Sequence, residues 1–530
     1  MAKNSSSDLS IEKVLFAGAD KLRGAIDPSE YKYVVLGLIF LKYISDSFEI
    51  KYNTLVEEGY GSEEDRDEYL ADGIFFCPEI ARWSYISKYA KSDDIGEIID
   101  NAMIAIEKEN SNLKGVLPKN YNRASLNKNN LGGLIDLFTN NISFGDLNEE
   151  KDVLGRVYEY FISNFASTEG KRGGEFYTPK SIVKTLVEII KPYKGKVYDP
   201  CCGSGGMFIQ SEKFTVAHGH RVQDIWIHGQ EYNESTRRLC LMNLAIRGIN
   251  GNIGESSDDT LRNDLHKTLK ADYILANPPF NQSEWGHDIL ANDVRWSYGL
   301  PPKGNANYAW LQHMIHHLNH NGVAGVVLAN GSMSTATNGE LEVRKNMIKD
   351  GVVEAIVALP GQMFFSTQIP ACLWILRKGR SAEEKKKTLF IDAREIGFMA
   401  DRVHKEFTDE DIANISTTYD KWKSKSVSAG LSTGSGLFYD AKTTRVKGHV
   451  LVKDDYKDIA GFCKSASLEE IEKNDWVLTP GRYVGIAESE EDSEPFEEKF
   501  PRLLSELKVQ IKKETDLNEE ILKQMSKVEV

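Results

Sequence analysis

The chain has 530 residues, which is enough for roughly three or four domains of about 150 residues each. Apolar residues make up 41% of it and charged residues 27%, and this composition excludes disorder as its main state. Acidic residues outnumber basic ones by 79 to 65, so the net charge of −14 excludes a chain that grips nucleic acid through a general basic excess.

The cysteines and the N-terminal sequence indicate the compartment. None of the cysteines forms a C-x-x-C pair or lies at zinc-ligand spacing from histidine, so reduced thiols are expected. The first ten residues contain no apolar core of a signal peptide, and the longest apolar stretch that follows, residues 34–41, is too short to span a membrane. These features predict a soluble, cytoplasmic protein. The six cysteines are Cys77, Cys201, Cys202, Cys240, Cys372 and Cys463.

The first 165 residues are predicted to form an α-helical domain. Asp27 and Pro28 are typical of a helix start, and apolar residues follow them on one helical face. Residues 56–73 are acidic and polar and predict a solvated loop, whereas residues 153–165 predict a further helix. The apolar face comprises Tyr33, Leu36, Phe40, Tyr43, Ile44 and Phe48.

From about residue 180, short β-rich runs alternate with helical stretches. This alternation predicts a parallel sheet with helices on both faces, and therefore an α/β domain. The expected strands are residues 196–198, 225–227, 273–276, 323–328, 353–358 and 373–376.

The pattern weakens after about residue 400. Residues 420–447 are rich in Ser, Lys, Gly and Thr and predict a loop or linker, and residues 486–499 are acidic. A C-terminal helix then shows an interrupted heptad pattern, which is typical of packing on another helix, either of a partner or of the same chain. The pattern comprises Phe500, Leu504, Leu507, Ile511, Ile521, Met525 and Val528.

A glycine-rich turn follows the first expected strand, which ends at Asp199. Ser204, Gly205 and Gly206 lie in this turn, where a ligand can approach the backbone closely. The turn is not a full G-x-G-x-x-G and has no following G-K-[ST], so a dinucleotide or P-loop site is disfavoured. The second strand leads to Glu231, a position suited to ribose hydroxyls, although an exposed turn residue would look the same.

The most informative segment is Asn277-Pro278-Pro279-Phe280, directly after an apolar strand. The prolines fix the backbone and remove two N–H donors, so that the Asn277 amide oxygen and the Pro278 carbonyl can accept both hydrogens of one exocyclic amino group. Phe280 offers a face on which a flipped base can stack. A strand-ending Pro-Pro turn is the alternative for this tetrapeptide alone.

Residues 199–206 together with Asn277–Phe280 resemble the S-adenosylmethionine-dependent DNA adenine-N6 methyltransferases. More closely, the chain resembles the modification subunits of type I restriction–modification systems. Further blocks that carry this resemblance are residues 37–44, 174–179, 307–310, 359–365 and 478–484.

The resemblance implies a role for each matching residue. Glu175, Phe176, Tyr177, Thr178, Pro179 and Lys180 would line the methionine end of the cofactor, S-adenosyl-L-methionine. Asp199, Ser204, Gly205 and Gly206 would form the turn beneath it, Glu231 would bind its ribose and Asp259 would lie near its adenine. Asn277, Pro278, Pro279 and Phe280 would hold the target adenine.

The family implies a Rossmann-like methyltransferase fold that acts on a base flipped out of double-stranded DNA. Sequence reading would come from a separate specificity subunit flanked by two modification subunits, with an optional restriction subunit. The expected domains are a helical domain over 1–165, a methyltransferase domain over 166–465 and a C-terminal assembly region with a helical tail over 466–530. No metal is expected, because the sulfonium methyl group is already activated.

Other readings account for fewer of these features. Pro200-Cys201 matches the nucleophile motif of a C5-cytosine methyltransferase but lies in the cofactor turn. Methyltransferases of protein glutamine amides share Asn-Pro-Pro-aromatic but typically have Tyr in the fourth position. An inactive scaffold subunit is the non-enzyme alternative.

A set of histidines shows helical spacing without an evident acidic partner, which favours an exposed or partly packed helix face over a metal site. The set comprises His313, His316, His317 and His320.

Overall fold

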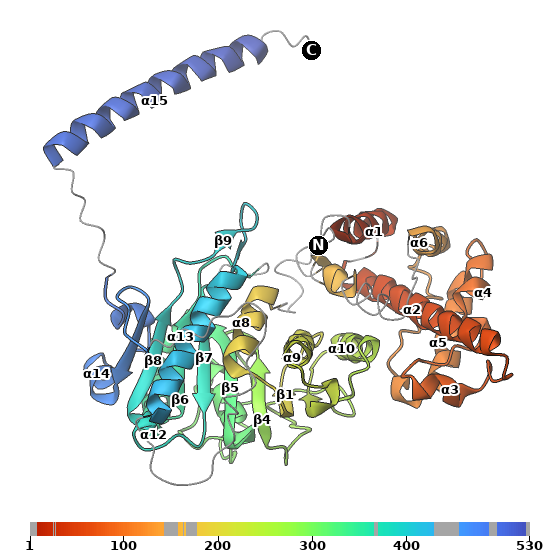
Figure 1. Ribbon diagram of the computed structural model, residues 1–530, viewed down its shortest axis with the longest axis horizontal. Coiled ribbons are helices and arrows are strands. Elements are labelled where there is room, and N and C mark those ends of the chain that lie inside the picture. The colour runs from red at the N-terminus through yellow and green to blue at the C-terminus, as the bar shows by residue number, and fades with distance from the viewer. Residues whose placement is uncertain are drawn as a thin grey trace.

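The computed structural model describes residues 8–24, 26, 28–141, 157–162, 164–165, 178–364, 369–428, 455–486 and 496–525. An N-terminal helical domain packs beside an α/β domain, and one long C-terminal helix extends away from both (Figure 1). No helix among the described residues is long and apolar enough to cross a membrane.

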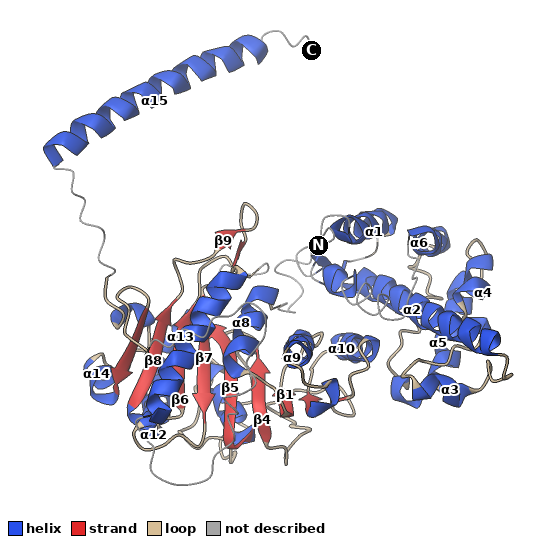
Figure 2. Cartoon of the chain, in the orientation of Figure 1, coloured by secondary structure: helices blue, strands red, loops and turns tan. Residues whose placement is uncertain are grey.

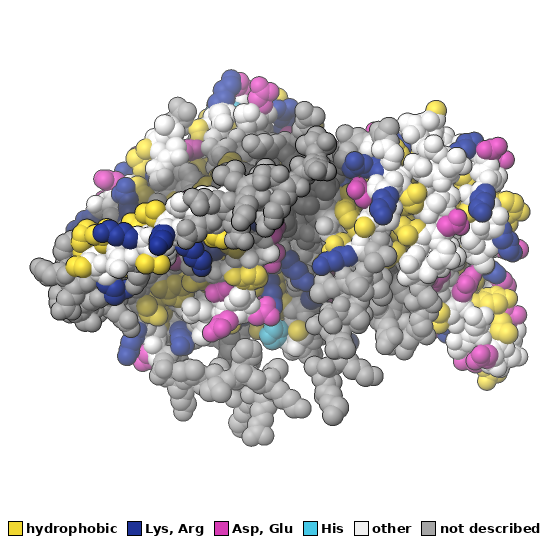
Figure 3. Space-filling model, turned by 90° about the horizontal axis from the view of Figure 1, so that it is seen from above, with side chains coloured by type: hydrophobic (Ala, Val, Ile, Leu, Met, Phe, Trp, Pro, Cys, Tyr) yellow, Lys and Arg dark blue, Asp and Glu magenta, His cyan; other side chains and the backbone are white. Residues whose placement is uncertain are grey.

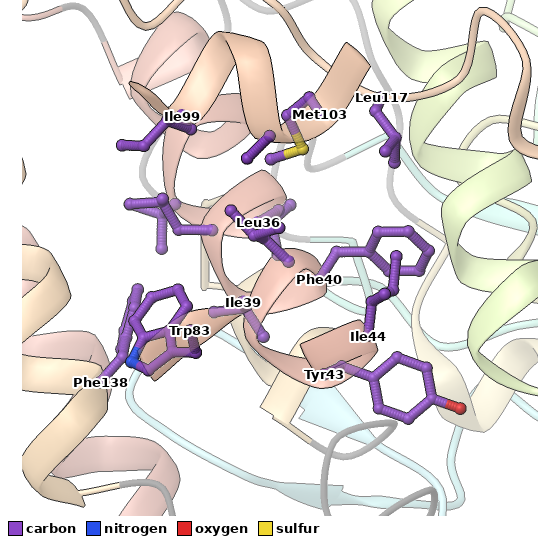
Figure 4. Close-up of a cluster of buried hydrophobic side chains, with 14 of the residues drawn as sticks. Leu36, Ile39, Phe40, Tyr43, Ile44, Trp83, Ile99, Met103, Leu117 and Phe138 are labelled. Atoms are coloured by element: carbon purple, nitrogen blue, oxygen red, sulfur yellow. The ribbon is translucent and has the colours of Figure 1, made fainter. Parts of the chain in front are cut away.

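The helical domain contains no strand within the described part of residues 8–165. Its longest helix begins at Pro28, as the sequence predicts, and its apolar residues form the centre of the domain core (Figure 4). Figure 4 shows Leu36, Ile39 and Phe40 of this helix facing side chains of the surrounding helices. The helices are α1 (Asp8–Leu22), α2 (Pro28–Glu58), α3 (Arg66–Ala71), α4 (Trp83–Lys88), α5 (Ile95–Glu109) and α6 (Lys128–Asn141).

The expectation of a solvated loop over residues 56–73 is wrong for its second half. The Asp65 side chain accepts a hydrogen bond from the backbone N–H of Asp67 and so caps α3. Tyr69 of α3 is fully buried and stacks on Phe48, with ring centroids 4.4 Å apart. The capping residue and the buried aromatic thus help to hold this otherwise acidic segment in place.

The α/β domain is built on a nine-stranded sheet with the order β11-β8-β6-β7-β5-β4-β1-β2-β3 (Figure 2). All six expected strands are present. The larger strands are β1 (Gly195–Asp199), β2 (Ile225–Gly229), β4 (Ala271–Ala276), β5 (Leu318–Ala329), β6 (Val353–Ala358), β7 (Ala371–Arg377), β8 (Lys387–Asp392) and β11 (Cys463–Ser467), with the short strand β3 (Gly251–Asn252) at one edge.

The expectation of a parallel sheet is confirmed for most strand pairs but is wrong for β7 and β11. Strand β7 runs antiparallel to both neighbours, β5 and β6, and β11 runs antiparallel to β8. The remaining pairs are parallel. No described helix lies between β6 and β7, and an antiparallel neighbour needs no helical crossover. The sequence contains the apolar run of β7 but no signal for its direction.

Helices cover both faces of the sheet, as predicted. Because side chains alternate along each strand, the sheet supports two cores, one beneath α8, α9, α10 and α13 and the other beneath α11, α12 and α14. Their bounds are α8 (Lys180–Ile190), α9 (Gly206–Ala217), α10 (Glu234–Ile246), α11 (Asn307–His317), α12 (Glu340–Asp350), α13 (Asp409–Ser428) and α14 (Leu468–Lys473).

Helix α13 occupies the first part of the linker expected over residues 420–447. Tyr419 and Trp422 are buried against the sheet, so the segment up to Ser428 is a packed helix; residues 429–454 lie outside the described residues. A small antiparallel pair, β9 (Phe398–Met399) and β10 (Lys405–Glu406), precedes it.

A buried ion-pair network joins α13 to the sheet. Glu354 of β6 is fully buried, and its carboxylate accepts hydrogen bonds from Arg377 Nε (2.6 Å), Lys423 Nζ and Tyr419 Oη. Burial alone would raise the pKa of Glu354, but Arg377, Lys423 and Arg380 outweigh it and lower this pKa to about 2.

The segment after residue 455 contains β11, which forms one edge of the sheet, and the long helix α15 follows it in the chain. Tyr483 stacks on Phe390 of β8, with ring centroids 3.9 Å apart. The predicted terminal helix is present as α15 (Phe496–Met525), and its described apolar side chains, including Leu507 and Ile511, are exposed. Figure 3 shows hydrophobic and basic side chains together on the surface where α15 lies. Packing of α15 on its own chain is therefore not seen among the described residues.

Candidate active site

The glycine-rich turn connects β1 to α9. The Asp199 carboxylate accepts a hydrogen bond from the backbone N–H of Cys201 at 3.0 Å and so closes the turn. Gly205 has a φ of 84°, and a Cβ there would lie 2.9 Å from Cys240 Sγ, so both backbone and space require glycine. At Gly203, by contrast, an added Cβ would meet no atom within 4 Å.

Asp199 is almost completely buried at the end of β1. Burial raises the pKa of Asp199 to about 7, and the nearby Glu231 carboxylate adds to the rise, while the N–H and S–H groups of Cys201 oppose it. A carboxyl group with this pKa can change its charge near neutral pH.

Glu231 bridges the loops that follow β1 and β2. Its Oε2 accepts a hydrogen bond from the backbone N–H of Gly203 and its Oε1 from that of Asn233, both at 2.9 Å. The two amides orient the carboxylate at the wall of a cavity of about 660 Å³. A carboxylate is a hydrogen-bond acceptor and is suited to hydroxyl groups of a ligand.

Asn277 directly follows β4, and its side-chain amide is oriented by a neighbouring hydroxyl. Nδ2 of Asn277 donates to Oγ1 of Thr178 at 2.9 Å. Oδ1 of Asn277 is buried and has no hydrogen-bond partner in the described structure. A buried acceptor without a partner is costly, and such atoms are typical of functional sites.

An aromatic ring packs against Phe280, the last residue of the Asn277–Phe280 tetrapeptide. Phe280 contacts Phe364 edge-to-face, with ring centroids 5.6 Å apart. Phe364 follows β6, whose carboxyl end lies at the same edge of the sheet as that of β4. Phe365, which belongs to the same sequence block, lies outside the described residues.

The structure brings most of the predicted site residues to one place. Ser204, Glu231, Asp259, Asn277 and Pro279 line the large cavity. Two small cavities share lining residues with it, and these contain Thr178, Lys180, Asp199 and Gly206. Pro179, Gly205, Pro278 and Phe280 line none of these cavities, and Glu175, Phe176 and Tyr177 lie outside the described residues.

Several lining residues were not expected from the sequence. Lys32 of α2 and Ile162 come from the helical domain, and Trp310 comes from α11. Asp258 lines the cavity beside Asp259, whose Oδ1 accepts from the backbone N–H groups of Leu261 and Arg262. No local pattern could identify Lys32, because its position depends on the packing of two domains.

The expectation for the histidine set is wrong in two respects. His313 and His317 are fully buried rather than exposed or partly packed, and Asp264 is an acidic partner, 2.9 Å from His317 Nε2. One possible ligand atom from each of Asp264, His313 and His317 lies within 4.8 Å of the others, which is close enough to hold a metal ion. However, Arg295 and Tyr198 contact the two ring nitrogens of His313, and burial lowers its pKa well below the usual value. An arginine in contact disfavours a cation, so the cluster is better explained as a buried polar network.

Comparison with known proteins identifies similar chains. The family model "N-6 DNA Methylase" matches residues 149–492, and the model "HsdM N-terminal domain" matches residues 11–138. The chain is 46% identical to the type I restriction enzyme HindI methylase subunit of Haemophilus influenzae, over 84% of this chain and 98% of the relative. It is 38% identical to the MjaIX methylase subunit of Methanocaldococcus jannaschii, over 96% of this chain and 90% of the relative.

A solved structure has a similar arrangement over most of the chain. This is the methyltransferase subunit of a type I restriction–modification system from Streptococcus thermophilus, which is 25% identical with a TM-score of 0.73. The superposition covers 90% of this chain and 99% of that structure.

Proposed function

Because the chain belongs to the N-6 DNA methylase family, as a methylase subunit of a type I restriction–modification system, we propose how its residues carry out adenine-N6 methylation. The single observation that supports the proposal most is the buried, unpartnered Oδ1 of Asn277, a residue that lines a large cavity. This acceptor is suited to the amino group of an adenine.

We propose S-adenosyl-L-methionine as the cofactor, and the residues present fit it. Gly203 has open space where a side chain would stand, and Glu231 presents an oriented carboxylate at the cavity. In this proposal Glu231 binds the ribose hydroxyls, Asp258 and Asp259 lie near the cofactor adenine, and the turn from Asp199 to Gly206 with residues 175–180 holds the methionine end. When bound, the cofactor supplies a methyl group activated by its sulfonium.

We propose that Asn277 Oδ1 and the Pro278 carbonyl accept the two hydrogens of the adenine amino group. Its lone pair is delocalised into the ring, and holding both hydrogens favours a pyramidal nitrogen whose lone pair is available for attack. Phe280, backed by Phe364, offers a stacking face for a base flipped out of duplex DNA. As the new N–C bond forms, the methyl–sulfur bond breaks, and the amine afterwards loses one proton to water. No strong base is needed, because positioning supplies most of the rate.

The raised pKa of Asp199 predicts that cofactor binding depends on pH. Its pKa of about 7 means that it is neutral below neutrality and anionic above it, and only the anion attracts a cationic ammonium group. Affinity for S-adenosylhomocysteine is expected to rise from about pH 6 to about pH 8, with a smaller rise in Asp199→Asn. Calorimetric titration of both proteins over this range measures it, and the variant corrects for titration of the ligand itself. Identical pH profiles would exclude Asp199 as the responsible group.

We propose that sequence reading comes from a separate specificity subunit, flanked by two copies of this chain, with a restriction subunit as an optional partner. The exposed apolar residues of α15, such as Leu507 and Ile511, support an assembly role for the C-terminal region. The net charge of −14 supports weak, non-specific DNA binding by the isolated chain. Tight site-selective binding of DNA by the chain alone would contradict this division of labour.

The direct experiment follows transfer of a tritiated methyl group to duplex DNA with the specificity subunit present. Label on adenine N6 is expected. Cofactor binding without transfer would favour the alternative of an inactive scaffold subunit. Mapping of modified adenines in a host with and without this chain and its specificity subunit would give the recognition site.

A further inference from the structure

Helix α2 of the helical domain carries a lysine to the wall of the large cavity. Lys32 lines this cavity together with Ile162, and only 6% of Lys32 is exposed. The other lining residues come from the α/β domain, including Thr236 and Leu239 of α10. The cavity is therefore formed by two domains, and a cationic side chain from the helical domain faces it.

A packed interface fixes the position of Lys32 relative to the cavity. Leu239, Met242 and Ile246 of α10 belong to the hydrophobic core of the helical domain. Tyr43 Oη donates to the carbonyl of Ile246 at 3.2 Å, and Tyr33 Oη lies 3.4 Å from Thr236 Oγ1. Since Tyr33 is the next residue in α2, this interface also positions Lys32.

The other charged groups of the cavity are mainly acidic. They are Glu231, Asp258, Asp259 and Glu284, together with one arginine, Arg262. The Arg262 guanidinium donates to the Glu284 carbonyl and lies 3.5 Å from the Asp259 carboxylate. S-adenosylmethionine carries two cationic groups, which suit the acidic side chains, and one anionic group, its carboxylate.

We propose that Lys32 binds the carboxylate of the methionine moiety, so that the cofactor is held between the helical and the α/β domains. This inference rests on the proposed function. Lys180 is a second candidate cation, because it lines the small cavity that shares Ile162 and Ser204 with the large one. Lys180 is exposed, however, and water screens an exposed charge more strongly than a buried one.

The test compares two ligands on the full chain by isothermal titration calorimetry. S-adenosylhomocysteine has the carboxylate, whereas 5′-methylthioadenosine keeps the adenine and ribose but lacks the amino-acid part. Lys32→Met is expected to weaken S-adenosylhomocysteine about 10- to 100-fold and to leave 5′-methylthioadenosine unchanged. Lys32→Arg should retain most of the affinity, and Lys180→Met, which alters the wall at the methionine end, should weaken S-adenosylhomocysteine less than Lys32→Met does.

Other results of these titrations would overturn either the role of Lys32 or the proposed function. Equal losses for both ligands, or a loss confined to Lys180→Met, would overturn the role of Lys32. Unchanged affinity of Lys32→Met for S-adenosylhomocysteine would also overturn it. Failure of the unaltered chain to bind either ligand would contradict the proposed function itself, and the two failures are thereby distinguished.

A second, independent inference concerns Thr178. An amide has one donor end and one acceptor end, so the hydrogen bond from Asn277 Nδ2 to Thr178 Oγ1 fixes where Oδ1 points. Oδ1 is the buried atom without a partner. We infer that Thr178 is a positioning residue, which presents Asn277 Oδ1 to the target amino group rather than acting only at the cofactor.

Thr178→Val keeps the shape of the side chain and removes the acceptor, whereas Thr178→Ser keeps the hydroxyl. Thr178→Val is expected to lower kcat about tenfold with a smaller change in the Kd for S-adenosylhomocysteine, and Thr178→Ser to retain kcat within about twofold. Unchanged kcat in Thr178→Val, or a loss found only in the cofactor Kd, would contradict the positioning role.

Discussion

Replacement of Asn277 by alanine is expected to lower methyl transfer on the order of 10³-fold while S-adenosylhomocysteine binding stays near that of the unaltered chain. Asn277 Oδ1 is the side-chain acceptor proposed for the adenine amino group, and a preorganised polar group of this kind typically contributes 10²- to 10³-fold to the rate. Glu231 and the glycine turn are held by their own hydrogen bonds, so the cofactor part of the cavity should survive.

The measurement is single-turnover transfer of tritiated methyl to duplex DNA in complex with the specificity subunit, with cofactor affinity determined by calorimetry. Asn101→Ala is a matched control, because Asn101 is exposed on α5 in the helical domain. The control should transfer at the normal rate. Turnover of Asn277→Ala close to that of the control would refute the assigned role.

Local sequence signals predicted the strands and the turns of the candidate site well. Each of the six apolar runs forms a strand, because a run of β-branched residues bounded by turn residues carries its own signal. Glycine turn, Glu231 and Asn277 meet because parallel strands β1, β2 and β4 end at the same edge of the sheet. A sequence pattern that predicts these three strands to be parallel therefore also predicts that the three groups lie at one site.

Features that depend on long-range packing were not predictable in this way. The direction of β7 is set by its two neighbours, and the burial of His313 and His317 depends on Asp264, about fifty residues earlier in the chain. Lys32 reaches the cavity only because α2 packs on α10. In each case the relevant partner is remote in sequence, and no periodicity of the local residues records it.

Removal of the Glu354 charge is expected to cause a large loss of stability, because this carboxylate is the shared partner of a buried ion-pair network. Glu354→Gln keeps the size of the side chain but leaves Arg377, Arg380 and Lys423 without their shared buried counter-charge. Removal of one partner from a buried network typically costs about 3–5 kcal/mol. The thermal unfolding midpoint of the α/β domain should fall by about 6–20 °C, at roughly 2–4 °C for each kcal/mol in a domain of this size.

Glu383→Gln is the matched control, because the Glu383 side chain is exposed and its ion pair among the described residues is with exposed Lys386 in the same short segment. Its unfolding midpoint should not change. The pH gives a second check: the pKa of Glu354 is lowered from 4.5 to about 2, so its contribution is complete above about pH 4.5 and is lost as the pH falls towards 2. The difference between Glu354→Gln and the unaltered chain should therefore be constant near neutrality and shrink in acid. Equal midpoints at neutral pH would show that α13 is held to the sheet by its apolar contacts alone.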